Sequence, residues 1–78
     1  MQIFVKNGLT GKTYCMKDIK LEMLIEDFKY LVFEHAGIKP YDQRLLFTGK
    51  ELQDAKTIEF YKIQKESTIF IVKRQDGG

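Results

Sequence analysis

Gln2-Ile3-Phe4-Val5-Lys6 and Thr68-Ile69-Phe70-Ile71-Val72 decide the fold of this 78-residue chain. In both stretches every second residue is isoleucine or valine, a pattern that predicts strands with one buried face. A strand near each end of the sequence, with a hairpin and a helix between them, predicts one mixed sheet whose first and last strands run parallel at its centre. The helix would pack across one face, so the expected fold class is a two-layer α+β structure.

A hairpin turn should follow the first strand, because Asn7-Gly8 tolerates the positive φ angles that tight turns need. The second strand is expected over residues 12–19. Its alternation is imperfect, since Ile19 is out of phase with Tyr14 and Met16. An extra residue in a β-bulge would return Ile19 to the core side.

A helix is predicted over residues 24–36, where the hydrophobic period changes from two to about 3.6. Gly37 is suited to end this helix, and Pro40 follows shortly after. Residues 21–24 offer no side chain of the kind that usually caps a helix start. The core-facing stripe consists of Ile25, Phe28 and Val32.

Shorter elements should complete the fold. Strands are expected over residues 43–47 and 51–52, and one helical turn over residues 57–61. No repeat or linker divides the chain, so we expect one domain over residues 1–72 and a flexible tail over residues 73–78.

Composition argues against several classes of function. The single cysteine, Cys15, excludes an internal disulfide and favours no metal site. The net charge of +2 comes from interspersed charges, which argues against nucleic-acid binding. No apolar stretch or leader points to a membrane, so the expected location is the cytoplasm and nucleus. His35 has no evident nucleophile as a partner, and no phosphate-binding loop occurs, so we expect no enzyme and no cofactor.

Several motifs resemble those of the ubiquitin-like β-grasp family across the whole chain. The resemblance requires one extra residue in the first turn and one between Tyr14 and Asp18. The matching segments are residues 1–6, Leu9-Thr10-Gly11-Lys12-Thr13, Gln43-Arg44-Leu45, Phe47, Gly49-Lys50, Tyr61, Ile63-Gln64-Lys65-Glu66-Ser67-Thr68 and Gly77-Gly78.

The resemblance implies a protein modifier that is activated at its terminal glycine and joined by an isopeptide bond to target lysines. Gly78, with Gly77, would be the conjugated end, and Arg74 would be recognised by the activating enzyme. Conjugating enzymes and ligases would be further partners. Lys73, Gln75 and Asp76 depart from the family pattern, so we expect slower removal by deubiquitinases.

Five lysines match positions on which ubiquitin chains grow, although lysines at such positions also serve solubility. Lys50 and Lys65 lie in the best preserved local sequences. Leu31 and His35 replace lysines at two further positions of this kind. The matching lysines are Lys6, Lys12, Lys29, Lys50 and Lys65.

The resemblance also implies an apolar patch that ubiquitin-binding domains contact. Phe70 replaces a histidine there, which removes a polar group and adds apolar area. Partners that need a hydrogen bond at this position would lose it, whereas partners that accept an aromatic anchor would gain one. The patch residues are Leu9, Leu46, Phe70 and Val72.

The predicted helix carries more apolar residues than one stripe can bury. Tyr30, Leu31 and Phe33 could form an additional binding or self-association face, or a shifted helix could bury some of them. Two functions therefore stay open: a conjugated modifier, and a non-conjugated binding module that engages a partner through an enlarged apolar surface. The other apolar residues in excess are Met23, Leu24, Tyr41 and Phe60.

Overall fold

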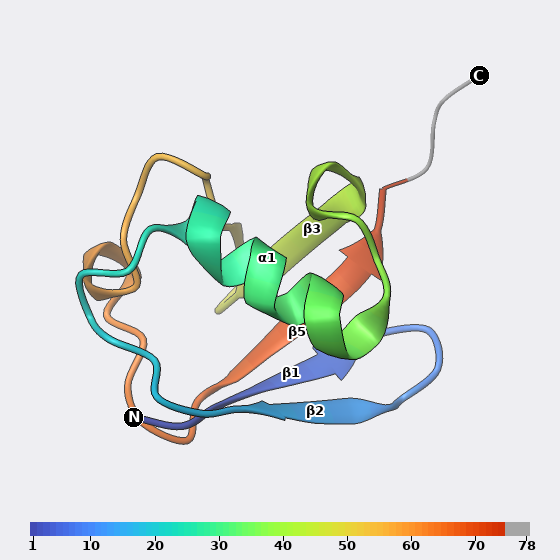
Figure 1. Ribbon diagram of the computed structural model, residues 1–78, viewed down its shortest axis with the longest axis horizontal. Helices are drawn as coiled ribbons and strands as arrows, with labels where there is room; N and C mark the ends of the chain where they lie inside the picture. The colour runs from blue at the N-terminus through green and yellow to red at the C-terminus, as the bar shows by residue number, and fades with distance from the viewer. Residues whose placement is uncertain (75–78) are drawn as a thin grey trace.

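The computed structural model describes residues 1–74 and shows a mixed sheet covered on one face by a helix (Figure 1). Over these residues the sheet has five strands in the order β2-β1-β5-β3-β4. The helix α1 and two short 3₁₀ turns, η1 and η2, connect them. The elements are β1 (Ile3–Asn7), β2 (Thr13–Met16), α1 (Ile25–Ala36), η1 (Pro40–Asp42), β3 (Gln43–Phe47), β4 (Lys50–Glu51), η2 (Glu59–Tyr61) and β5 (Thr68–Lys73).

The two stretches that decide the fold pair as predicted. Strands β1 and β5 run parallel at the centre of the sheet, with Phe4 opposite Thr68 and Asn7 opposite Ile71. Strand β2 pairs antiparallel with β1, and β3 pairs antiparallel with β5. The predicted α+β class, with one helix packed across a mixed sheet, is therefore confirmed.

The core lies between α1 and the sheet. Ile25, Phe28 and Val32 are fully buried, so the predicted helical stripe is confirmed. Every second side chain of the central strands packs against this stripe, because successive residues of a strand point to opposite faces. The buried residues of the two central strands are Ile3, Val5, Ile69 and Ile71.

Backbone groups, rather than a polar side chain, stabilise the start of α1. Leu24 occupies the N-cap position without a capping hydrogen bond from its side chain within residues 1–74. Instead, the amides of Ile25 and Glu26 donate to the carbonyls of Lys56 and Asp54 at 2.8 and 3.2 Å. These bonds satisfy two amides that a helix cannot pair internally, which explains how the start tolerates a poor cap sequence.

The prediction of a β-bulge in the second strand was wrong. Strand β2 ends at Met16, and Asp18 then adopts a left-handed conformation with φ of 60°. This turn points Ile19 into the core, where its amide donates to the Met1 carbonyl at 2.8 Å. The N-terminal ammonium of Met1 in turn donates to the Ile19 carbonyl. The phase change thus comes from a residue outside the sheet.

Other boundaries differ slightly from the sequence-based expectation. Strand β4 covers Lys50–Glu51, and Leu52 is buried beyond its end. Strand β5 continues through Lys73, and the amide of Arg74 donates to the carbonyl of Asp42. The first two residues of the segment expected as a flexible tail are thus held by the domain. Residues 75–78 lie outside the described part of the chain.

The burial of Phe28 makes a stability prediction. Phe28→Ala removes a ring from the centre of the core and should lower the free energy of unfolding by about 3–5 kcal/mol. Phe60→Ala is the matched control, because its ring is 58% exposed, and it should cost less than about 1 kcal/mol. Urea unfolding of both variants checks this, and equal losses would contradict the assigned core.

Candidate functional site

The predicted apolar patch lies on the face of the sheet opposite α1. Leu46 and Phe70 are direct cross-strand neighbours on β3 and β5. Val72 lies two residues beyond Phe70 and therefore on the same face. Phe70 and Leu9 are exposed, whereas Leu46 and Val72 are half-buried. The structure thus brings three of the four predicted residues together on two adjacent strands.

The turn after β1 brings Leu9 to this face. The amide of Gly8 donates to the carbonyl of Ile71 at 3.0 Å, which extends the β1–β5 contact into the turn. A Cβ atom on Gly8 would lie only 3.3 Å from Cγ1 of Val72. Gly8 thus permits the close approach that places Leu9 beside the end of β5.

Arg74 lies directly next to the patch. Its guanidinium is 3.4 Å from Glu51 Oε2, and the guanidinium of Arg44 is 3.2 Å from Glu51 Oε1. All three side chains are about half exposed, so these ion pairs orient the arginines more than they stabilise the fold. Leu9, Val72 and this charged cluster line one shallow depression of about 580 Å³.

The four residues that follow Arg74 lie outside the described part of the chain. They include Gly77 and Gly78, which the sequence predicts as the conjugated end, as well as Gln75 and Asp76. Their predicted roles stay predictions.

The five candidate acceptor lysines divide into two groups. Lys6, Lys12, Lys50 and Lys65 are exposed. Lys29 differs, because its side chain is 7% exposed and its Nζ lies 2.6 Å from Asp54 Oδ1. An acceptor amine must reach a bulky thioester, so Lys29 must leave this ion pair before it can react. This burial separates it from the surface lysines with which the sequence grouped it.

Gln43 is a structural residue that the sequence analysis did not single out. Its side chain is fully buried, and Nε2 donates to the carbonyls of Lys29 and Ile38, both at 2.8 Å. These bonds connect β3 to α1 and to the segment after it. Oε1 has no hydrogen-bond partner among the described residues. A polar residue at a strand start carries no sequence signal for such burial.

The expected apolar face of Tyr30, Leu31 and Phe33 is not a single face. Successive helical residues are about 100° apart, which puts Tyr30 and Phe33 on one flank of α1 and Leu31 on the other. Leu31 packs partly against the core, as does Met23. The apolar excess is thus split: some of it is buried, and some is exposed.

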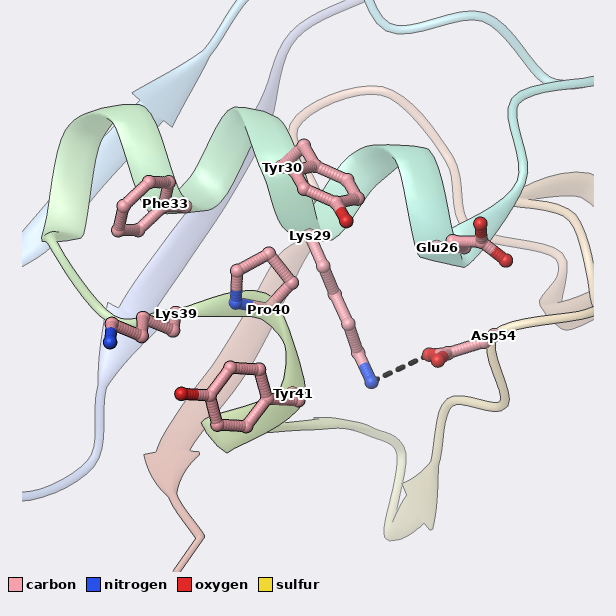
Figure 2. Close-up of a pocket in the computed structure, with 8 residues that line it drawn as sticks. All are labelled: Glu26, Lys29, Tyr30, Phe33, Lys39, Pro40, Tyr41 and Asp54. Carbon is pink, nitrogen blue, oxygen red and sulfur yellow. Dashed lines mark ion pairs between the residues drawn. The ribbon is translucent and has the colours of Figure 1, made fainter.

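Tyr30 and Phe33 form one wall of an aromatic groove, whose second wall is Pro40 and Tyr41 of η1 (Figure 2). The groove has a volume of about 440 Å³. From the sequence, Tyr41 was only one of several apolar residues in excess. Gly37 and Pro40 nevertheless signal a chain reversal that returns Tyr41 toward the helix. The lining residues are Glu26, Lys29, Tyr30, Phe33, Lys39, Pro40, Tyr41 and Asp54.

Two other sequence observations can be placed. His35 is exposed near the end of α1, with Nδ1 3.0 Å from the carbonyl of Leu31. Across residues 1–74, no group of three histidine, cysteine or acidic side chains is arranged to hold a metal ion. In the same part of the chain, no helix is long and apolar enough to cross a membrane.

The parallel central strands, the single covering helix of residues 1–74 and the sheet order define a β-grasp fold. The family model described as "Ubiquitin family" matches residues 3–76, and the chain belongs to this family.

Known relatives include both short proteins and domains of long ones. The chain is 38% identical to the NEDD8-like protein RUB3 of Arabidopsis thaliana, over all of this chain and 97% of that protein. It is 35% identical to the ubiquitin-like protein NEDD8 of Dictyostelium discoideum, over 86% of this chain and 92% of that protein. Identity to the E3 ubiquitin-protein ligase parkin of Drosophila melanogaster is 34%, over 94% of this chain but 15% of that protein.

The lysine geometry makes a reactivity prediction. Under limiting amine-reactive acylation, Lys29 should be modified at least about tenfold more slowly than Lys50 or Lys65, because its amine is buried and ion-paired. Asp54→Asn should narrow this difference, since it removes the charge that holds Nζ. Peptide mass spectrometry measures each rate, and equal rates at all five lysines would contradict the assigned burial.

Proposed function

We propose that this protein is a ubiquitin-like modifier that is conjugated through the carboxylate of Gly78. The observation that carries the proposal is the position of Arg74. It is held at the edge of the Leu9–Leu46–Phe70–Val72 patch, four residues before Gly78. An enzyme that docks on the patch and reads Arg74 would have the Gly77-Gly78 segment within reach. NEDD8-like relatives of nearly the same length support this function.

The chemistry follows that implied by the family. The Gly78 carboxylate would attack the α-phosphate of ATP and release pyrophosphate. A cysteine thiolate of the activating enzyme would then displace AMP to form a thioester. A target lysine amine would finally attack the thioester carbonyl and release the thiol, leaving an amide bond. This chain supplies the carboxylate and the docking surface, and the partner enzymes supply the catalytic groups.

Glu51 affects how an activating enzyme would bind Arg74. Its carboxylate contacts the guanidinium groups of both Arg44 and Arg74. An acidic recognition loop of an activating enzyme would compete with Glu51 for Arg74. Because the contacts are exposed, this competition costs little, about 1 kcal/mol or less.

A charging assay tests the proposal. A chain that ends at Gly78 is incubated with ATP and the activating enzyme of ubiquitin or of NEDD8, and a thiol-reducible adduct is expected with one of them. Removal of Gly78 should abolish the adduct. Arg74→Glu should slow its formation at least about tenfold, because it puts a like charge against an acidic reader.

Lys20→Glu is the matched control, since it makes the same charge change on an exposed loop residue and should leave charging unchanged. Absence of an adduct with both enzymes, or an adduct that persists without Gly78, would contradict the proposal.

A second candidate function is a non-conjugated binding module. Its support is the exposed ring of Phe70 at the centre of the patch, together with a parkin relative in which the matching segment is a small part of the protein. In this function the patch would engage ubiquitin-binding domains directly, and Gly78 would have no role.

Binding measurements test the patch, which both functions use, whereas the charging assay with and without Gly78 separates the two functions. Phe70→Ala should weaken binding of ubiquitin-binding domains at least about tenfold, because a central aromatic anchor is lost. Phe60→Ala, which removes an exposed ring outside the patch, is the control and should have no effect. Titration calorimetry measures both affinities. A Phe70→Ala variant that binds normally would remove the patch from either function.

A further inference from the structure

The aromatic groove between α1 and η1 is separate from the apolar patch. Leu9, Leu46, Phe70 and Val72 lie on the face of the sheet away from α1, and none of them lines the groove. Tyr30, Phe33 and Tyr41 line it and are 58%, 40% and 70% exposed. Three large exposed rings on one concave surface are typical of an interaction site.

The two ends of the groove carry opposite charges. Glu26, in the first turn of α1, lies at one end beside Asp54 (Figure 2). The charge of Asp54 is matched by Lys29, so Glu26 gives this end its net negative charge. Lys39, two residues after Gly37, lies at the other end. Within residues 1–74 neither Glu26 nor Lys39 forms an ion pair, although Lys39 lies 5.9 Å from the centre of the Tyr41 ring.

We propose that the groove binds a second copy of this chain, with the two α1 helices antiparallel about a two-fold axis. The axis would pass between Tyr30 and Phe33, so that Tyr30 of each copy packs against Phe33 of the other. Glu26 precedes Tyr30 by about one turn, and Gly37 follows Phe33 by about one turn. The same axis therefore brings Glu26 of each copy to the end of the groove where Lys39 of the other copy lies.

Charge complementarity favours a second copy as the occupant. An aromatic centre between an acidic and a basic end is its own complement under two-fold rotation, because the rotation exchanges the ends. Glu26 to the end of α1 spans about 15 Å, so both charged contacts and the aromatic centre fit one helix pair. The formal net charge of +2 gives only weak repulsion between copies.

The size of the groove predicts a weak dimer. Standard stable interfaces bury about 800 Å² and roughly 20–30 residues on each partner. The groove is lined by eight residues, fewer than one side of a standard interface. The accessible surface of the whole chain is 5241 Å². Dimers should therefore form at about 100 µM and above rather than at nanomolar concentration.

The dimer would leave the patch accessible on both copies, because α1 and the patch lie on opposite faces of the sheet. A dimer would then present two patches to a partner with two binding domains. Such a bivalent contact raises the apparent affinity without any new contact at either patch.

Analytical ultracentrifugation of the full chain from about 10 µM to about 1 mM tests the proposal. The chain should shift from monomer toward dimer with concentration. Glu26→Lys and Lys39→Glu should each weaken dimerisation at least about tenfold, because each creates two like-charge contacts. Phe60→Ser, which alters a ring as exposed as that of Tyr30, should leave it unchanged.

The decisive experiments combine the two charge reversals, first in one chain and then as a mixture of the two single variants. The double variant should dimerise like the original chain. An equimolar mixture of the two single variants should form a heterodimer, since every contact between them joins opposite charges. A chain that stays monomeric at about 1 mM overturns the proposal. So does a dimer that ignores the reversals, or single variants whose mixture fails to associate.

Discussion

The parallel pairing of β1 with β5 is the contact on which the rest of this structure depends. It joins the two ends of the sequence through bonds such as the Phe4 amide to the Ser67 carbonyl, at 2.9 Å, and the Gly8 amide to the Ile71 carbonyl. Because both strands are central, β2 and β3 can add to their outer edges. One face of the pair packs against α1 in the core, and the opposite face carries the apolar patch.

The same pairing explains how distant residues meet at the candidate site. Leu9 follows β1 and Arg74 follows β5, and parallel strands end at the same edge of a sheet. Leu9 and Arg74, which are 65 positions apart in the sequence, are therefore brought close together. The absence of a Cβ atom at Gly8 permits this approach. Glu51, at the end of β4, then holds Arg74 at the rim of the patch.

The sequence predicted those features that follow from hydrophobic periodicity. The alternation around Ile3 and Ile69 identified the central strands, and the stripe through Phe28 identified the buried flank of the helix. The end of the helix at Gly37 was also predictable, since its φ of 74° suits glycine. These signals are local, and a buried face repeats them several times.

What the sequence did not predict depends on contacts between distant residues. The burial of Lys29 requires Asp54, and the burial of Gln43 requires carbonyls of α1 and of Ile38. A polar residue gives no sign that such partners exist. The left-handed turn at Asp18 was not predicted for a related reason. It is held by the hydrogen bonds between Ile19 and Met1, which are distant in the sequence.

The molecule thus presents two surfaces of different chemistry on opposite sides of one sheet. Native-state hydrogen exchange of the Phe4 and Gly8 amides tests most directly whether the β1–β5 pairing supports both. These amides should exchange only through global unfolding, with the free energy measured by urea denaturation. The Leu52 amide, at the edge next to β4, should open at a lower free energy. Exchange at Phe4 and Gly8 that is as easy as at Leu52 would contradict a central role for the pairing.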